Sequence, residues 1–193
     1  MKSNILTASV VGLFIASIVL PVSAAPENYR IDSVHSMVLF RIKRSDVSYV
    51  YGRFNNPEGT LVVDADNPAG DAFTVQVATE NVDTGNGNRD NHLRSPDFFN
   101  AQQFRTISFK STSVAKTEDK KYEVTGQLSL HGVEKEIKVV LEETGRGEAR
   151  GRSMIGFEGK FTIKRSDFGM SGMMGMIGDE VTLIVSFLGQ GGN

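Results

Sequence analysis

The segment KYEVTGQLSLHGVEKEIKVVL, from Lys121 to Leu141, decides the fold class. In its first half, polar residues alternate with an apolar or small series at Tyr122, Val124, Gly126, Leu128 and Leu130. After His131-Gly132, a second apolar series follows at Ile137, Val139 and Leu141. A period of two predicts half-buried strands, and the His-Gly pair predicts a short turn between antiparallel neighbours.

The same alternation recurs along the chain. Further strands are predicted around Val38–Ile42, Phe73–Thr79, Ile107–Phe109, Ile155–Ile163 and Val181–Phe187, which gives about eight strands. Turns are predicted at residues 55–57, 66–70, 131–132 and 145–151. Because no βαβ spacing is present, these patterns favour an all-β antiparallel barrel or sandwich over a parallel sheet.

Two stretches break the alternation. Residues 81–103 predict a loop with helical turns, in which Asn88 could cap a turn through Arg89 to Leu93 and Ser95 could cap another. Residues 166–179 carry four methionines and four glycines. Flexible methionine side chains adapt to irregular apolar shapes, so this segment suggests an apolar mouth or lid.

The first 24 residues have the composition of a secretory signal. Lys2 precedes an apolar run from Ile5 to Leu20, and Val22-Ser23-Ala24 predicts cleavage after Ala24. One mature domain, residues 25–193, is predicted. The chain has no cysteine, so this domain must depend on a full-sized apolar core. Removing Lys2 changes the net charge from −2 to −3, which gives no electrostatic reason to expect nucleic acid.

A barrel of about eight strands can be filled by its own side chains or can hold one small ligand, and periodicity does not distinguish these. The three histidines have no metal-site spacing, and no nucleophile elbow, phosphate loop or dinucleotide fingerprint is present. No metal, cofactor or catalytic residue is therefore predicted. His35 with Asp32, or His92 with Asp90, remains as an acid–base alternative.

Several motifs occur in an order that resembles the YceI-like family of bacterial periplasmic proteins. They begin with Tyr29–Ser36 and Gly52-Arg53-Phe54, continue with Arg89–Phe99 and Gly126–Val133, and end with Arg165–Gly169. Together they extend over essentially the whole mature chain. In one departure, Phe104-Arg105 stands where the family commonly has an aromatic residue followed by proline.

The resemblance implies an extended, lipocalin-like, eight-stranded antiparallel barrel with a helical loop and an internal apolar cavity. It also implies a periplasmic protein that binds, carries or stores a polyisoprenoid or similar long-chain amphiphile, such as an isoprenoid quinone or its precursor, without catalysis. The side chains expected to line the cavity are Val38, Phe40, Phe54, Val75, Val77, Phe109, Leu128, Phe157 and Phe161. Phe98, Phe99, Phe168 and Met173 are expected to close the mouth, with Arg89, His92 and Arg94 as head-group partners.

Two alternatives stay open at this stage. One is a filled barrel that acts as a structural or interaction module and docks to a membrane-protein partner. The other is an enzyme that processes the same lipids with His35 or His92. The sequence is compatible with a monomer or a homodimer.

Overall fold

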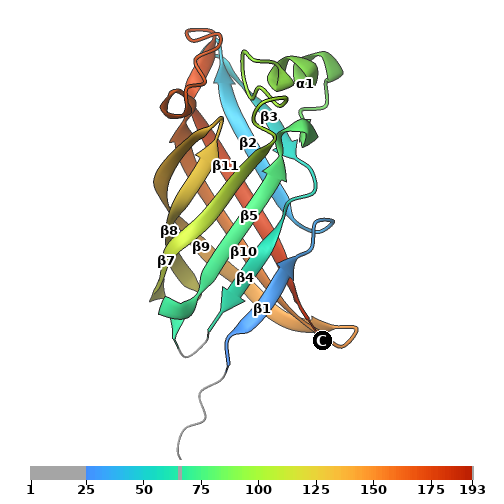
Figure 1. Ribbon diagram of the computed structural model, residues 1–193, viewed down its shortest axis with the longest axis vertical. Helices are drawn as coiled ribbons and strands as arrows, with labels where there is room; N and C mark the ends of the chain where they lie inside the picture. Colours follow the sequence, from blue (N-terminus) through green and yellow to red (C-terminus); the bar gives the residue numbers. More distant parts are fainter. Residues whose placement is uncertain (1–24, 65–66, 193) are drawn as a thin grey trace, which may run out of the picture.

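The computed structural model describes residues 25–64 and 67–192. The predicted signal peptide, residues 1–24, lies outside these ranges. Figure 1 shows a tall barrel with helix α1 at its upper end and the C-terminus at its lower end. The strands are β1 (Glu27–Ile31), β2 (Met37–Arg44), β3 (Ser48–Phe54), β4 (Glu58–Val63), β5 (Ala72–Ala78), β6 (Val82–Asp83), β7 (Thr106–Glu118), β8 (Lys121–Leu130), β9 (Val133–Ala149), β10 (Arg152–Lys164) and β11 (Ile177–Gly191).

The barrel closes because β1 pairs with strands on both of its sides. Tyr29 lies opposite Leu61 of β4 and opposite Gly191 of β11. The resulting ring, β1-β4-β5-β7-β8-β9-β10-β11, contains eight strands, and every pair in it is antiparallel. At the upper end, β2, β3 and β6 continue the wall beside β11. The predicted all-β, eight-stranded antiparallel barrel is confirmed.

The predicted helical loop contains α1 (Gly87–Arg94). Its cap is Asn86, not Asn88, because the Asn86 side chain accepts a hydrogen bond from the backbone N–H of Arg89 at 3.0 Å. Ser95 begins a hydrogen-bonded turn and no further α-helix. Among the residues described, no helix has the length and apolar character needed to cross a membrane. The part of the chain that the structure describes also contains three 3₁₀ turns, at Pro68–Gly70, Thr79–Asn81 and Arg165–Phe168.

The predicted turn at residues 131–132 joins β8 and β9, with positive φ angles of 54° and 76° at His131 and Gly132. The turn predicted at residues 145–151 is wrong in extent, because β9 continues to Ala149 and the turn is only Arg150-Gly151. The glycines here accompany a bulge: Phe157 lies opposite Glu143 and Gly156 opposite Gly145, so Thr144 is an extra residue.

Apolar side chains fill the lower half of the barrel. We call this packed group the floor: Tyr29, Leu61, Phe73, Tyr122, Val124, Ile155 and Phe157, all almost fully buried. Ring contacts reinforce it, since Phe157 meets Phe73 and Tyr122 edge to face at 5.3 and 5.5 Å between centroids. The floor closes one end of the barrel.

Candidate functional site

A cavity of about 760 Å³ occupies the barrel interior above the floor. Its lining extends from Arg44, the last residue of β2, and Met173 to Leu141 and Phe157, which belong to the same apolar cluster as the floor. This volume lies within the range of roughly 300–1,000 Å³ that is typical of small-molecule sites. The barrel is therefore hollow rather than filled.

Strand alternation creates this lining, because every second residue of a strand points to the same face. On β2, Val38, Phe40, Ile42 and Arg44 line the cavity. Fourteen of the sixteen residues predicted from the sequence lie on the cavity wall: Val38, Phe40, Phe54, Val75, Val77, Arg89, His92, Phe98, Phe99, Phe109, Leu128, Phe157, Phe161 and Met173. The inward register is thus the predicted one, whereas the ligand contacts themselves stay a prediction.

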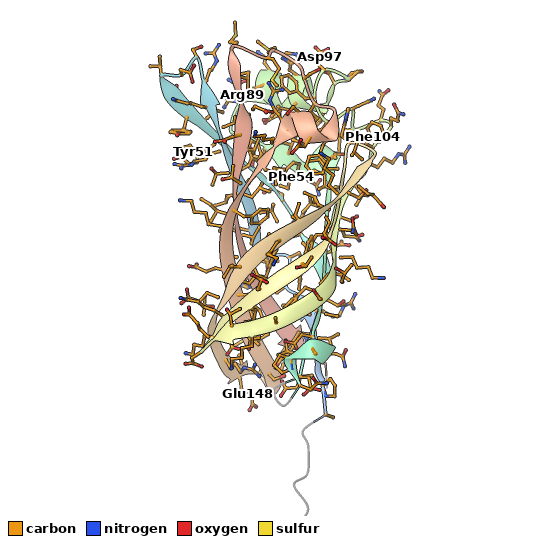
Figure 2. The ribbon with its side chains drawn as sticks, turned by 90° about the vertical axis from the view of Figure 1, so that its left-hand side faces the viewer. Tyr51, Phe54, Arg89, Asp97, Phe104 and Glu148 are labelled. Atoms are coloured by element: carbon orange, nitrogen blue, oxygen red, sulfur yellow. The ribbon has the colours of Figure 1, made fainter. Side chains whose placement is uncertain are left out.

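Aromatic rings gather in the upper cavity. The Phe54 ring lies 5.7 Å from Phe40 and 5.3 Å from Phe99, measured between centroids. In Figure 2, Phe54 lies inside the upper barrel, whereas Tyr51, from the same strand, points outward. Such rings offer a broad apolar surface with little conformational freedom to lose.

The structure places Arg94 and Phe168 outside the cavity wall. Arg94 turns towards its own loop, where its guanidinium donates hydrogen bonds to the carbonyl oxygens of Glu80 and Val82, both at 2.9 Å. Phe168 is buried beside Leu128 and Met170, in a cluster behind the wall. Both residues therefore stabilise the entrance from outside the cavity.

The charged side chains of the cavity wall lie near its upper end. Arg89 donates from Nε to the Thr84 hydroxyl at 2.7 Å and from Nη2 to the Thr84 carbonyl oxygen at 2.8 Å. Figure 2 shows Arg89 at the top of the barrel. Arg44, which also lines the cavity, forms no ion pair within the described part of the chain. Two guanidinium groups are thus available to an anionic or carbonyl head group.

Arg165 holds the methionine-rich loop against the barrel. Its side chain is only 3% exposed, yet no carboxylate forms an ion pair with it among the residues described. It donates instead to the carbonyl oxygens of Met170, Gly172, Ile177 and Gly178 at 2.7–3.1 Å. Burial lowers the pKa of this guanidinium. Arg165 thereby fixes the loop that forms one side of the entrance.

Below the floor, a carboxylate is buried inside the barrel. Glu143 accepts a hydrogen bond from the Tyr122 hydroxyl at 3.1 Å and two from the Arg146 guanidinium at 2.9 and 3.1 Å. Burial alone would raise the pKa of Glu143, but the hydrogen bonds and positive charge of Arg146 outweigh it and the pKa is lowered. This network gives the polar groups of these three side chains, at the closed end of the barrel, their hydrogen-bond partners, and none of the three side chains lines the cavity.

Neither of the two suggested acid–base pairs is formed inside the cavity, where it could act on a bound lipid. His35 contacts Asp32 at 2.8 Å, but both residues lie outside the cavity wall. The His92–Asp90 pair does not form: His92 contacts Asp97 at 3.0 Å, while Asp90 is buried and accepts hydrogen bonds from Thr84. In Figure 2, Asp97 lies at the very top of the barrel.

The sequence reasoning missed many wall residues. Leu183, Val185 and Phe187 belong to an alternating series that was already recognised, and Arg44 extends the series of Val38–Ile42, so the alternation itself would have found all four. Thr84, Asn88 and Arg165 also line the cavity but belong to loops, where no period marks the inward side.

Known proteins are similar to this chain in sequence or in fold. Protein YceI of Escherichia coli O157:H7 is 38% identical over 185 residues, which cover 94% of this chain and 96% of that protein. The crystal structure of Burkholderia cenocepacia BcnA matches with a TM-score of 0.75 and 22% identity, over 82% of this chain and 98% of that one. A polyisoprenoid-binding domain from Saccharophagus degradans matches with a TM-score of 0.67 and 19% identity, over 85% and 98% of the two chains.

At these identities, the two structures show a shared fold alone. The sequence carries the family assignment, since residues 29–188 match the YceI-like domain family. Together with the identity to protein YceI, this match covers most of the barrel described above. The chain belongs to the YceI-like family.

Proposed function

We propose that this protein binds, carries or stores a polyisoprenoid or similar long-chain amphiphile in its barrel cavity, without catalysis. One observation carries the proposal: the cavity of about 760 Å³ is lined mainly by apolar side chains, and its charged side chains lie near its upper end. A long apolar tail with a small polar head matches this distribution. Isoprenoid quinones and their precursors have this form.

The apolar wall would supply the affinity. Each CH₂ group transferred from water to an apolar environment gains roughly 0.8 kcal/mol, so a chain of many carbons binds without ionic contacts. The aromatic rings of Phe40, Phe54 and Phe99 would contact the tail near the entrance. Below them, the floor would end the tail and so limit the length that fits.

The head group would meet Arg44, Arg89 and His92 at the entrance. Arginine donates to phosphate or carbonyl oxygens in a fixed geometry, so it suits both a prenyl phosphate and a quinone. Thr84 orients Arg89 through two hydrogen bonds, which reduces the conformational freedom that Arg89 would lose on binding.

Two kinds of observation favour this proposal over its rivals. The hollow interior favours a carrier over a filled barrel. The Saccharophagus degradans neighbour is described as a polyisoprenoid-binding domain, and the family suggests a binding protein rather than an enzyme. A periplasmic location is part of the proposal and depends on the signal-like composition of residues 1–24.

The first test is native mass spectrometry of protein purified from its own host, followed by organic extraction and identification of what is bound. We expect a prenyl chain at near-equal stoichiometry. Protein that is repeatedly empty and also takes up no added isoprenoid would refute the proposal.

A matched pair of variants tests whether the tail lies inside the barrel. Val38 faces the cavity and packs against both the apolar cluster that contains the floor and the cluster around Phe40 and Phe54. Its neighbour Leu39 is not part of the cavity wall. Val38→Phe should block the cavity at mid-depth and weaken isoprenoid binding by roughly tenfold or more, while Leu39→Phe should leave binding unchanged. Equal affinity of both variants, measured by titration with a fluorescent prenyl analogue, would contradict binding inside the barrel.

A further inference from the structure

Exposed apolar side chains surround the upper opening of the cavity. Val47, at the tip of the β2–β3 hairpin, is 87% exposed, and Met173, Met174 and Met176 are each 42–47% exposed. We call these four residues the entrance rim. The two segments are joined, because the Ser45 backbone N–H donates to the Met176 carbonyl oxygen at 2.7 Å. Figure 1 shows the hairpin and the loop side by side at the upper end.

The entrance rim is continuous with the cavity. Met173 lines the cavity and is exposed at the same time, and Arg44 and Ser48 line it from the two strands that flank Val47. An apolar molecule that leaves the cavity here would pass over methionine side chains. Exposed apolar groups at the tips of loops, rather than on a flat face, suit insertion among lipid chains.

The charge of the hairpin differs from that of the whole chain. Residues 41–47 contain Arg41, Lys43 and Arg44 against the single acid Asp46, although the protein as a whole has a net charge of −2. Within the hairpin, Asp46 lies 3.5 Å from Lys43, whereas the acids Asp179 and Glu180 belong to the neighbouring strand β11, where Asp179 accepts two hydrogen bonds from Ser166, so the excess of positive charge is confined to the hairpin. A basic hairpin with an apolar tip is complementary to an anionic lipid surface.

We propose that the entrance rim docks on an anionic phospholipid bilayer, with Val47 and the methionines among the lipid chains and Lys43 at the phosphates. The purpose of this contact rests on the carrier function proposed above, since the cavity would then open directly towards the membrane. Docking itself needs no carried lipid. The two proposals can therefore fail separately.

The test is co-sedimentation of the purified protein with vesicles of phosphatidylcholine, alone or mixed with phosphatidylglycerol. We expect binding to the mixed vesicles and weak binding to phosphatidylcholine alone. Val47→Asp and Met176→Asp, on the two halves of the rim, should each weaken binding by roughly tenfold or more, because a charge replaces an inserted apolar group. Lys43→Gln should reduce the preference for phosphatidylglycerol.

Val34→Asp is the matched control, because Val34 is 80% exposed but follows β1 in the lower part of the barrel. It should bind vesicles as the unaltered protein does, and circular dichroism should show that all variants are folded. No binding to either vesicle, or equal loss in Val34→Asp and Val47→Asp, would overturn the proposal. So would a sedimentation equilibrium experiment in which Val47→Asp abolishes self-association, since the rim would then cover a second copy of the chain. Isoprenoid binding by Val47→Asp, measured in detergent, should stay unchanged.

Discussion

The two ends of this barrel have the same strand alternation, but the inward side chains pack together at the lower end and enclose a cavity at the upper end. At the lower end, the inward side chains meet each other and leave no space: Ile155 and Val124 are fully buried, and Phe157 packs against two other rings. At the upper end, inward side chains of similar size face a cavity, and apolar groups of the entrance rim face outward. Packing density, and not hydrophobicity, therefore separates the structural end from the end that can take a ligand.

Matched isoleucine truncations should reveal this difference most strongly. Ile155 lies in the floor with no exposed surface, whereas Ile42 borders the cavity. Ile155→Ala should lower the free energy of unfolding by about 2–5 kcal/mol, because it removes buried methyl groups and leaves a new void. Ile42→Ala should cost less, roughly 1 kcal/mol, because its side chain already borders empty space. Urea unfolding measures the free energy of unfolding of both variants. Equal decreases in the two variants would show that the upper end is packed as tightly as the floor.

Glycine-to-alanine changes test the same contrast with added volume. A Cβ at Gly126 would lie 2.5 Å from the Lys110 carbonyl oxygen, which belongs to the backbone of the next strand and has little freedom to move. A Cβ at Gly52 would lie 2.3 Å from the tip of the Phe40 ring, which borders the cavity. Gly126→Ala should destabilise the protein by about 1–3 kcal/mol.

Gly52→Ala should instead have a small effect on stability, because the Phe40 ring can shift into the cavity. The displaced ring should reduce the space for ligand and weaken isoprenoid binding. Thermal unfolding and ligand titration separate the two outcomes. If Gly52→Ala is as destabilising as Gly126→Ala and leaves affinity unchanged, the upper wall is rigid.

Periodicity predicted the barrel well, because the alternation at Tyr122–Leu130 and Ile155–Ile163 depends on only one property, the side of the strand that faces the core. The alternation does not indicate how much space the inward side chains leave inside the barrel. It gave identical weight to Ile155, which packs in the floor and does not border the cavity, and to Phe161, which faces the cavity. Whether a barrel is hollow depends on how rings from distant strands meet, and no local pattern carries that information.

The residues that sequence reasoning misplaced or missed fall into two groups. Arg94 and Phe168 belong to loops, where the direction of a side chain depends on tertiary hydrogen bonds such as those from Arg94 to Glu80 and Val82. Glu143 was missed for another reason: it continues the inward series of Val139 and Leu141, but a carboxylate breaks the apolar pattern. Only the partners Tyr122 and Arg146 make its burial possible.

Glu143 gives the smallest and most specific test of the comparison, because its charge belongs to the closed end alone. Its pKa is lowered from the ordinary value of 4.5, so the ionised form stabilises the folded protein. This contribution is complete at pH values above 4.5 and is lost as the pH falls through the lowered pKa. Glu143→Gln should therefore be less stable than the unaltered protein at neutral pH, by roughly 1–2 kcal/mol, because Arg146 is one-third exposed and partly screened by solvent.

The difference between the two proteins should then shrink on acidification, since protonated Glu143 is as uncharged as the glutamine that replaces it in the variant. Asp71 acts in the opposite direction, because burial raises its pKa and acid favours its folded form, but it does so in both proteins and cancels in the comparison. Urea unfolding from pH 7 to about pH 3 measures the two curves. If the two stability curves stay parallel, the Glu143–Arg146 charge pair does not stabilise the floor. If they converge at low pH, the difference in stability that they show at neutral pH comes from the closed end of the barrel. The variants Val38→Phe and Leu39→Phe report separately on the open cavity.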